Sequence, residues 1–241
     1  MKSITWTSSL SFPGLLAAAI AITLLIVAAM GYQGEWWHFS TTLRLFDWAG
    51  YGAWLGLALS LFGGWMAWRQ HRRVRFASGV AGVILALPVA IMAIQFAWAA
   101  HAHPPINDVT TDPGDPPMFW DVPNPRAYPG AGVAELQREG YPELKPLKLE
   151  SAPEEVFERA EELVWERGWA IVAANPMDGQ IEAVDSTPLF GFKDNVVIRV
   201  LPENGGSRVD MRSHSRLGRI DRGVNARRIR AFLADLVDAA G

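Results

Sequence analysis

The chain has 241 residues, half of them hydrophobic, and carries 22 Lys or Arg against 25 Asp or Glu, giving a formal net charge of −3 at pH 7. This length and composition fit one ordinary domain together with a membrane region. The chain contains no cysteine, which excludes disulfides and is compatible with an exported domain that needs none.

Three long apolar runs occupy the first part of the chain, at residues 15–30, 49–68 and 76–100. Each approaches or exceeds the ~20 residues that cross a bilayer core of about 30 Å. Pro88 lies within the third run, where a membrane helix tolerates it. Three such runs exceed what the core of a soluble protein of this size uses, so we predict three transmembrane helices within residues 1–100.

Basic residues predict the orientation of these helices. The loop between the second and third runs holds four arginines within residues 69–75, whereas the first loop holds only Arg44 against Glu35 and Asp47. The arginine loop is therefore expected in the cytoplasm, together with the N-terminus. Residues after 100 are then periplasmic, on the outer side of a bacterial inner membrane. The alternative that the first run is a cleaved signal peptide leaves that side unchanged.

Aromatic residues are expected to mark the two membrane–water interfaces. The outer belt would comprise Trp36, Trp37, Phe39, Phe46 and Trp48, and the inner belt Trp65 and Trp68.

Charge is segregated along the chain. Residues 1–100 hold six Lys or Arg against two acids, whereas residues 101–241 hold sixteen against twenty-three. Within that acidic half, residues 208–230 contain eight arginines and two aspartates. Such a pattern steers anionic ligands or surfaces toward one face, although a self-neutralising solvated surface is the commoner explanation. Nucleic acid is not an expected partner on the outer side of a membrane.

Residues 101–150, here called the strap, are rich in proline. Prolines at this density are expected to exclude helix and to favour extended backbone. The strap also carries large apolar residues, which a flexible linker would lack. These are Ile106, Val109, Met118, Phe119 and Trp120. We therefore expect the strap to be ordered against the following domain and to cover an edge of it.

Residues 151–241 are predicted to form the folded domain. Ser151 and Glu154 are spaced as a capping box, and Pro153 suits the first turn of a helix that ends before Gly168. Its apolar stripe comprises Val156, Phe157, Ala160, Leu163 and Val164.

Four strands are predicted next. Residues 169–174 and 180–186 flank a turn at residues 175–179, and residues 196–202 and 207–213 form a hairpin. The Asn204-Gly205 pair suits a two-residue type I′ turn. That loop places Val200 opposite Val209, Ile198 opposite Met211, and Arg199 opposite Asp210 as an ion pair. One face of the second strand then carries the polar series Arg208, Asp210, Arg212, His214 and Arg216.

A last helix completes the domain, with Asn225 as its expected cap. Its buried face is predicted to comprise Ile229, Phe232, Leu233, Leu236 and Val237. The fold class is thus three N-terminal transmembrane helices followed by an α+β two-layer domain, an antiparallel sheet with two flanking helices.

Three groups of residues are candidates for catalysis, metal binding or phosphate binding. Ser213, His214 and Ser215 suggest a nucleophile beside a base, but on one strand the histidine points away from both serines. Two histidines, His101 and His103, with Asp108 and Asp112 are suited to a metal, yet histidines at a membrane exit more often lie in the interface. Residues 187–192 lack the glycines and lysine of a phosphate loop. We therefore predict no catalytic residue, no metal and no cofactor.

An anion site is the stronger candidate. Arginines surround the start of the last helix, where free N–H groups and the helix dipole favour an anion. The predicted set is Arg212, Arg216, Arg219, Arg222, Asn225 and Arg228. The alternative is that internal acids, among them Asp210 and Asp221, satisfy these arginines.

Several motifs resemble the uncharacterised DUF1499 family over residues 103–236. They are the run at residues 103–112, Thr187 with residues 190–192, and above all residues 210–229, which include Asp210, Ser213, Arg216 and Asn225. The helices ahead of them resemble the membrane-anchored bacterial versions. One departure is Asn195, where many members carry a second aspartate. The resemblance implies a domain and no activity.

The predicted function is binding rather than catalysis. We expect an inner-membrane protein whose periplasmic domain binds an anionic ligand or lipid, or scaffolds an envelope protein. The alternative is an envelope enzyme acting on an anionic, phosphorylated substrate, which would need a pocket with perturbed acids or bases beside the arginines.

Overall fold

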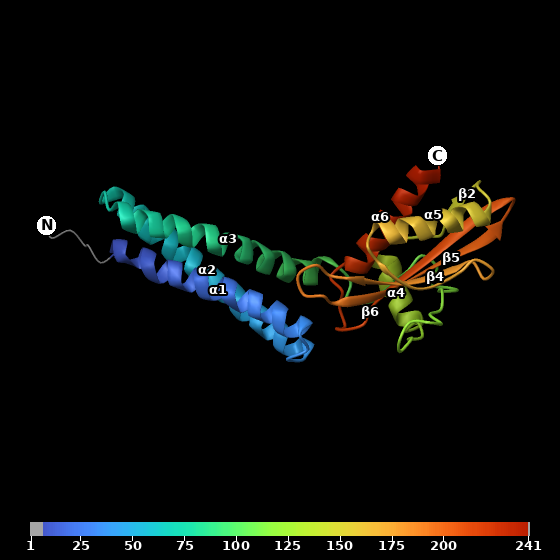
Figure 1. Ribbon diagram of the computed structural model, residues 1–241, viewed down its shortest axis with the longest axis horizontal. Coiled ribbons are helices and arrows are strands. Elements are labelled where there is room, and N and C mark those ends of the chain that lie inside the picture. The colour runs from blue at the N-terminus through green and yellow to red at the C-terminus, as the bar shows by residue number, and fades with distance from the viewer. Residues whose placement is uncertain (1–6, 241) are drawn as a thin grey trace. The chain divides into compact units, whose positions relative to one another are not determined.

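The computed structural model describes residues 7–240, with side chains to residue 238. The chain divides into two units (Figure 1). The first comprises the residues up to Trp98 together with Leu189–Gly191, and the second comprises Ala99–Pro188 and the residues from Phe192 onward. The strap therefore belongs to the second unit.

Helices make up most of the first unit. A short 3-10 helix, η1 (Thr7–Leu10), leads into α1 (Ser11–Gln33), which is followed by α2 (Phe39–Arg69) and α3 (Arg73–Ala102). All three predicted apolar runs are thus helical.

Glycines let the backbones of these helices approach closely. A Cβ added to Gly56 would lie 2.8 Å from the backbone nitrogen of Ala18, and one added to Gly79 would lie 2.7 Å from Cα of Gly64. The first contact joins α2 to α1 and the second joins α3 to α2. Close approach through small residues is typical of helices that pack within a membrane.

Two segments of the described chain are long and apolar enough to cross a membrane, Thr7–Gln33 and α3. Only 39% and 22% of their most apolar windows are buried, whereas the core helix of a soluble protein would be mostly buried. The 31-residue α2 does not qualify, because its glycines and tryptophans rank low in hydropathy. The structure therefore supports two candidate spans where the sequence predicts three.

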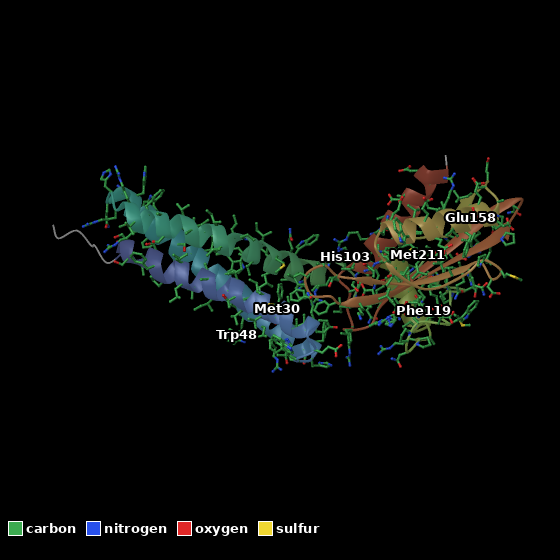
Figure 2. The ribbon with its side chains drawn as sticks, in the orientation of Figure 1. Met30, Trp48, His103, Phe119, Glu158 and Met211 are labelled. Atoms are coloured by element: carbon green, nitrogen blue, oxygen red, sulfur yellow. The ribbon has the colours of Figure 1, made fainter. Side chains whose placement is uncertain are left out.

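Large side chains project from these helices, among them Met30 and Trp48 (Figure 2). Four of the five tryptophans of the predicted belts are exposed, with Trp36 at 68% and Trp68 at 63%, whereas Trp37 is partly buried. Phe46 contradicts its predicted place in the outer belt, because it is 3% exposed and packs edge-on against Phe96 at 4.9 Å. It belongs to the helix interface instead.

A six-stranded antiparallel sheet forms the second unit, in the order β1-β6-β5-β4-β3 with β2 also on β6. The strands are β1 (Asp108–Thr110), β2 (Leu147–Leu149), β3 (Ala170–Asn175), β4 (Gln180–Ser186), β5 (Lys193–Glu203) and β6 (Gly206–Ser215). The predicted meander is β3 to β6. Both added strands come from the strap and pair with successive parts of β6, which confirms that the strap covers an edge.

The strap also contains a helix, α4 (Ala131–Gly140), which contradicts the expectation that proline excludes helix there. The prolines flank this segment, at Pro129 and Pro142, and none lies within it. The side-chain amide of Gln137 fixes α4 to β1 by accepting from the Thr110 N–H at 2.9 Å and donating to the Thr110 carbonyl at 2.6 Å.

The hairpin has the predicted loop and register. Asn204 and Gly205 both have positive φ, 51° and 84°, as a type I′ turn requires. Val200 lies opposite Val209, and Arg199 lies opposite Asp210.

Two helices, α5 (Pro153–Glu166) and α6 (Val224–Ala240), pack against the sheet around a core that includes Met211 (Figure 2). The predicted capping box of α5 is wrong: Ala152 is the N-cap, and the Ser151 carbonyl instead accepts the Ser207 hydroxyl at 2.6 Å. On α6, the prediction that Val237 belongs to the buried face is wrong, because this residue is 43% exposed.

Candidate functional site

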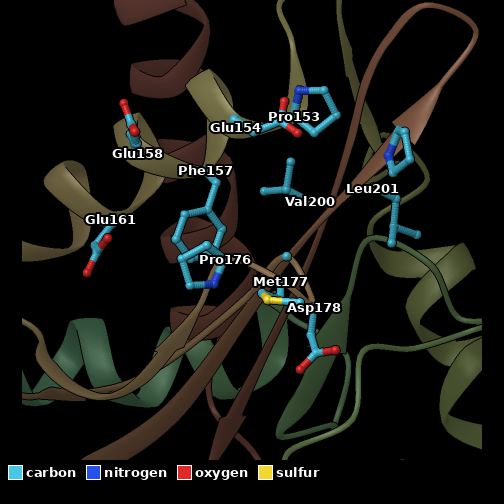
Figure 3. Close-up of a pocket in the computed structure, with 12 residues that line it drawn as sticks. Pro153, Glu154, Phe157, Glu158, Glu161, Pro176, Met177, Asp178, Val200 and Leu201 are labelled. Atoms are coloured by element: carbon cyan, nitrogen blue, oxygen red, sulfur yellow. The ribbon is translucent and has the colours of Figure 1, made fainter.

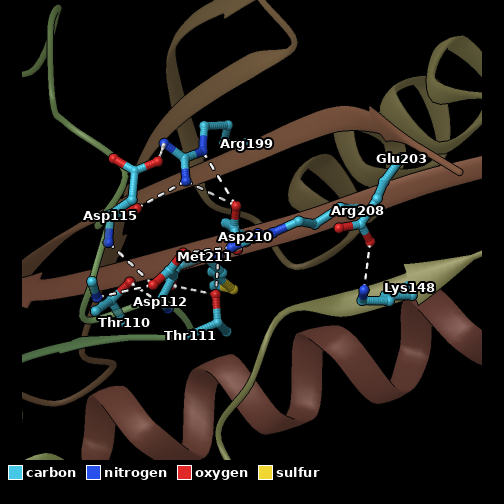
Figure 4. Close-up of polar contacts among 11 residues, drawn as sticks. Thr110, Thr111, Asp112, Asp115, Lys148, Arg199, Glu203, Arg208, Asp210 and Met211 are labelled. Carbon is cyan, nitrogen blue, oxygen red and sulfur yellow. Dashed lines mark hydrogen bonds and ion pairs between the residues drawn. The ribbon is translucent and has the colours of Figure 1, made fainter.

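The polar face of the β5–β6 hairpin lies against the strap. Asp210 accepts hydrogen bonds from Arg199 at 2.9 Å and from Arg208 at 3.1 Å, and Arg208 also binds Asp112 of the strap at 2.5 Å (Figure 4). Arg199 further pairs with Asp115 at 3.0 Å. The predicted ion pair is therefore part of a network that fastens strap to sheet.

Asp112 anchors the start of this network. Burial raises the pKa of its carboxyl, but backbone N–H groups of Asp115 and Gly114 and the Arg208 guanidinium outweigh burial and hold the pKa below its usual range. Asp112 therefore stays ionised and bound to Arg208 through neutral pH.

Arg212 is 1% exposed and is the most enclosed arginine of this face. It binds both carboxylate oxygens of Asp108, at 2.8 and 2.7 Å, in the fork geometry that arginine favours. Its remaining donors reach the carbonyls of Pro117 and Arg126, and its guanidinium lies 4.8 Å from the ring centroid of Phe119. Every one of these partners is in the strap, so Arg212 closes the strap over the sheet.

His214 continues the same face, opposite Asp108 of β1. Its side chain is 4% exposed, and its Nδ1 has no hydrogen-bond partner among the described residues. Burial lowers the pKa of His214 more than the nearby Asp108 raises it. The imidazole is therefore neutral at pH 7.

Glu182, on β4, is a buried carboxylate that the sequence analysis missed. It is 1% exposed and accepts backbone N–H bonds from Trp120, Asp121 and Val122 at 2.5, 3.0 and 2.9 Å. Three consecutive N–H groups of the strap thus bind the Glu182 carboxylate. Its partners lie about 60 residues away in sequence, so no local pattern indicates the contact.

A second polar network lies on the helix-facing side of β6. Arg228 of α6 donates to Asp185 at 2.8 Å, to Asp194 at 2.7 Å and to the Ser213 hydroxyl at 2.8 Å. The Asn225 side chain accepts from Ser213 at 2.7 Å and donates to the Ser215 hydroxyl at 3.0 Å. Arg228 is 7% exposed. These hydrogen bonds join the ends of β4, β5 and β6 to α6.

The start of α6 is occupied by an internal acid. Asp221 accepts the backbone N–H groups of Gly223 at 2.9 Å and Asn225 at 2.8 Å. Burial raises the pKa of Asp221 even though these two bonds lower it. The predicted cap is thus wrong: the capping side chain is Asp221, and Asn225 lies within the helix with its side chain turned to β6.

The structure separates the predicted anion-site residues into two groups. Arg212, Arg228 and Asn225 are buried in the networks above. At the surface lie Arg219, which is exposed, and Arg216 and Arg222, which are partly buried. Arg216 donates to the Asn195 side chain at 2.7 Å. Arg227, which the predicted set omits, is also exposed.

The structure also places the residues considered for catalysis and metal binding. His214 lies on the opposite face of β6 from Ser213 and Ser215, so the three do not form a nucleophile and base. The His103 ring lies within 2.7 Å of where a Cβ on Gly223 would be, which explains glycine there. The part of the chain that the structure describes has no group of three His, Asp or Glu suited to a metal ion.

A hollow of about 550 Å³ lies elsewhere on the domain, between α5, the β3–β4 turn and β5 (Figure 3). Its lining includes Phe157, Glu158, Glu161 and Met177, and no residue of the arginine-rich segment 216–228.

Sequence comparison identifies the domain. The profile of the family described as "Protein of unknown function (DUF1499)" matches residues 108–236, which is more than half of the chain and includes both polar networks. Comparisons with curated proteins and with solved structures gave no match. The chain belongs to the DUF1499 family.

Proposed function

We propose that this protein is a bacterial inner-membrane protein whose DUF1499 domain lies on the periplasmic side and binds anionic groups, lipid headgroups above all, at an arginine turn. The arginine turn comprises Arg216, Arg219, Arg222 and Arg227.

All three long helices are proposed to cross the membrane. Thr7–Gln33 and α3 supply two spans. The outer surface of α2 carries exposed apolar side chains along its length, including Leu55 at 58% and Leu61 at 54%. Such a surface is unfavourable in water and suits lipid. The positive-inside rule then puts the loop after α2 in the cytoplasm and the domain outside.

The single observation that supports anion binding is the distribution of charge around α6. Residues 208–230 carry eight arginines and two aspartates. The carboxylates of this region are already engaged: Asp194 and Asp185 bind Arg228, and Asp221 accepts the backbone N–H of Asn225 at the start of α6. Exposed arginines such as Arg219 and Arg227 are thus left facing solvent with a net positive charge, which attracts anions.

Binding is favoured over catalysis by the position of the hollow. An enzyme acting on an anion needs a concave site beside the arginines. The hollow of about 550 Å³ instead opens between α5 and the β3–β4 turn, and glutamates line it.

The test uses the full chain in a nonionic detergent. Dihexanoyl phosphatidylglycerol, inorganic phosphate and dihexanoyl phosphatidylcholine are titrated against wild type and an Arg219→Gln/Arg227→Gln variant. We expect the phosphatidylglycerol to bind more weakly as salt rises. The variant should lose about twofold to thirtyfold in affinity, since each of its two exposed charge contacts is worth about 0.2–1 kcal/mol. An Arg126→Gln/Arg138→Gln variant, which removes two exposed arginines of the strap, is the matched control.

Phosphate binding equal to lipid binding would identify a free anion as the ligand. Equal affinity for the choline lipid, or no loss in the Arg219→Gln/Arg227→Gln variant, would contradict the proposal.

A further inference from the structure

A trough runs along the outer side of α5. Its larger part is the hollow of about 550 Å³, with Phe157 and Val200 among its lining residues. A smaller hollow continues between α5 and β3, and both are lined by Glu158 and Glu161. Figure 3 shows the glutamates of α5 on one side of the larger hollow and Met177 with its neighbours on the other.

The charge of this trough is strongly negative. α5 carries six glutamates and one arginine. Of these, Glu154, Glu158, Glu161 and Glu162 line the trough, and no described residue forms an ion pair with any of them. Arg159 pairs with Glu155, outside the trough, at 3.5 Å. Glutamates three and four residues apart repel one another and destabilise a helix, so a cation placed between them relieves that repulsion.

Large apolar side chains are exposed beside these acids. Met177, at the tip of the β3–β4 turn, is 95% exposed, and Trp165, near the end of α5, is 75% exposed. Both line the trough. Tryptophan and methionine are enriched where proteins bind other proteins, and methionine adapts to varied apolar partners.

We propose that the trough binds a segment of a partner protein that is rich in lysine or arginine and carries a bulky apolar side chain. Its cations would lie between the glutamates of α5, and its apolar side chain would pack against Met177. An anionic membrane surface does not fit, because the glutamates repel it. This proposal does not depend on anion binding at the arginine turn.

Side-chain docking fits this surface better than addition of a strand. β3 is the edge of the sheet, but its pairing shifts between Ile171 and Ala173. A bulge of this kind twists an edge and opposes further pairing.

The experiment uses the full chain in nonionic detergent and a fluorescein-labelled peptide of sequence KKLLKKLLKKLL, with an oligolysine of the same length for comparison. Fluorescence anisotropy is corrected with empty micelles. We expect the leucine-containing peptide to bind more tightly than oligolysine. A Glu158→Gln/Glu161→Gln variant should weaken binding of the leucine-containing peptide about tenfold, whereas Glu135→Gln/Glu139→Gln, two exposed acids of α4, should leave it unchanged.

A second variant separates the apolar contribution to peptide binding from the contribution of charge. Met177→Ser should weaken binding of the leucine-containing peptide several-fold and leave oligolysine binding unchanged. Equal losses in the α4 control, or no loss in either trough variant, would overturn the proposal. Light scattering is measured on the same samples, and a dimer that dissociates in the Glu158→Gln/Glu161→Gln variant would assign the trough to a second copy of this chain and overturn it too.

Discussion

Arg212 is the residue on which the join between strap and sheet most depends. Replacing it by methionine keeps much of its volume but leaves the buried Asp108 carboxylate and two strap carbonyls without their partner. Breaking a buried ion pair in this way costs about 3–5 kcal/mol. We expect Arg212→Met to lower the free energy of unfolding by that amount in a urea titration of the detergent-solubilised protein.

The matched control is Arg219→Met, at an exposed position of the same segment, which should change the free energy of unfolding by about 0.5 kcal/mol or less. Equal effects of the two substitutions on the free energy of unfolding would show that the buried Arg212 ion pair does not stabilise the fold.

His214 makes stability depend on pH. Its pKa is lowered by burial from the ordinary 6.5, so the unfolded chain takes up a proton at a higher pH than the folded chain does. The stabilisation is therefore complete above about pH 6.5 and falls as pH decreases below it, by at most about 1.4 kcal/mol per pH unit. The melting temperature measured from pH 7.5 to 5.5 should decrease, and His214→Gln should flatten part of that decrease. An unchanged profile in the variant would assign the decrease to other groups.

Asp221 stabilises the start of helix α6. Its carboxylate accepts the N–H groups of Gly223, just before the helix, and of Asn225, in its first turn, so Asp221→Ala should cost about 1 kcal/mol, as the loss of a helix cap does. Asp221→Ser, which keeps an oxygen acceptor, should restore most of the loss in melting temperature. Equal melting temperatures for the alanine and serine variants would show that Asp221 does not stabilise the protein by capping α6.

Elements with local signals were predictable from the sequence. Asn204 and Gly205 specify their turn through positive φ, and with it the register of β5 and β6. β1 and β2 are three residues each and gain their order from pairing with β6, about 100 and 60 residues away, so nothing local indicates them. The cap of α6 was misassigned for a related reason: Asn225 has the right type for a cap, but Ser213 and Ser215 draw its side chain away.

The distribution of charge in the molecule is predictable from the sequence, but the ion-pair partner of each arginine is not. The excess of arginine around residue 216 is evident in the sequence, and so are the glutamates of α5. Which arginine meets which acid depends on the fold: Asp185, Asp194 and Asp108 lie far along the chain from the arginines that they hold. The trough is not evident in the sequence because Met177 comes from the β3–β4 turn, whereas the acids come from α5.

We propose that helices hold the DUF1499 domain on the outer side of a membrane, and the absence of cysteine from the chain allows a direct test. His71→Cys, between α2 and α3, and Glu139→Cys, on α4, each introduce one exposed thiol. In intact bacterial cells with a permeabilised outer membrane, a membrane-impermeant maleimide should label residue 139, and it should label residue 71 only after lysis. Labelling of residue 71 but not of residue 139 in intact cells would contradict this orientation.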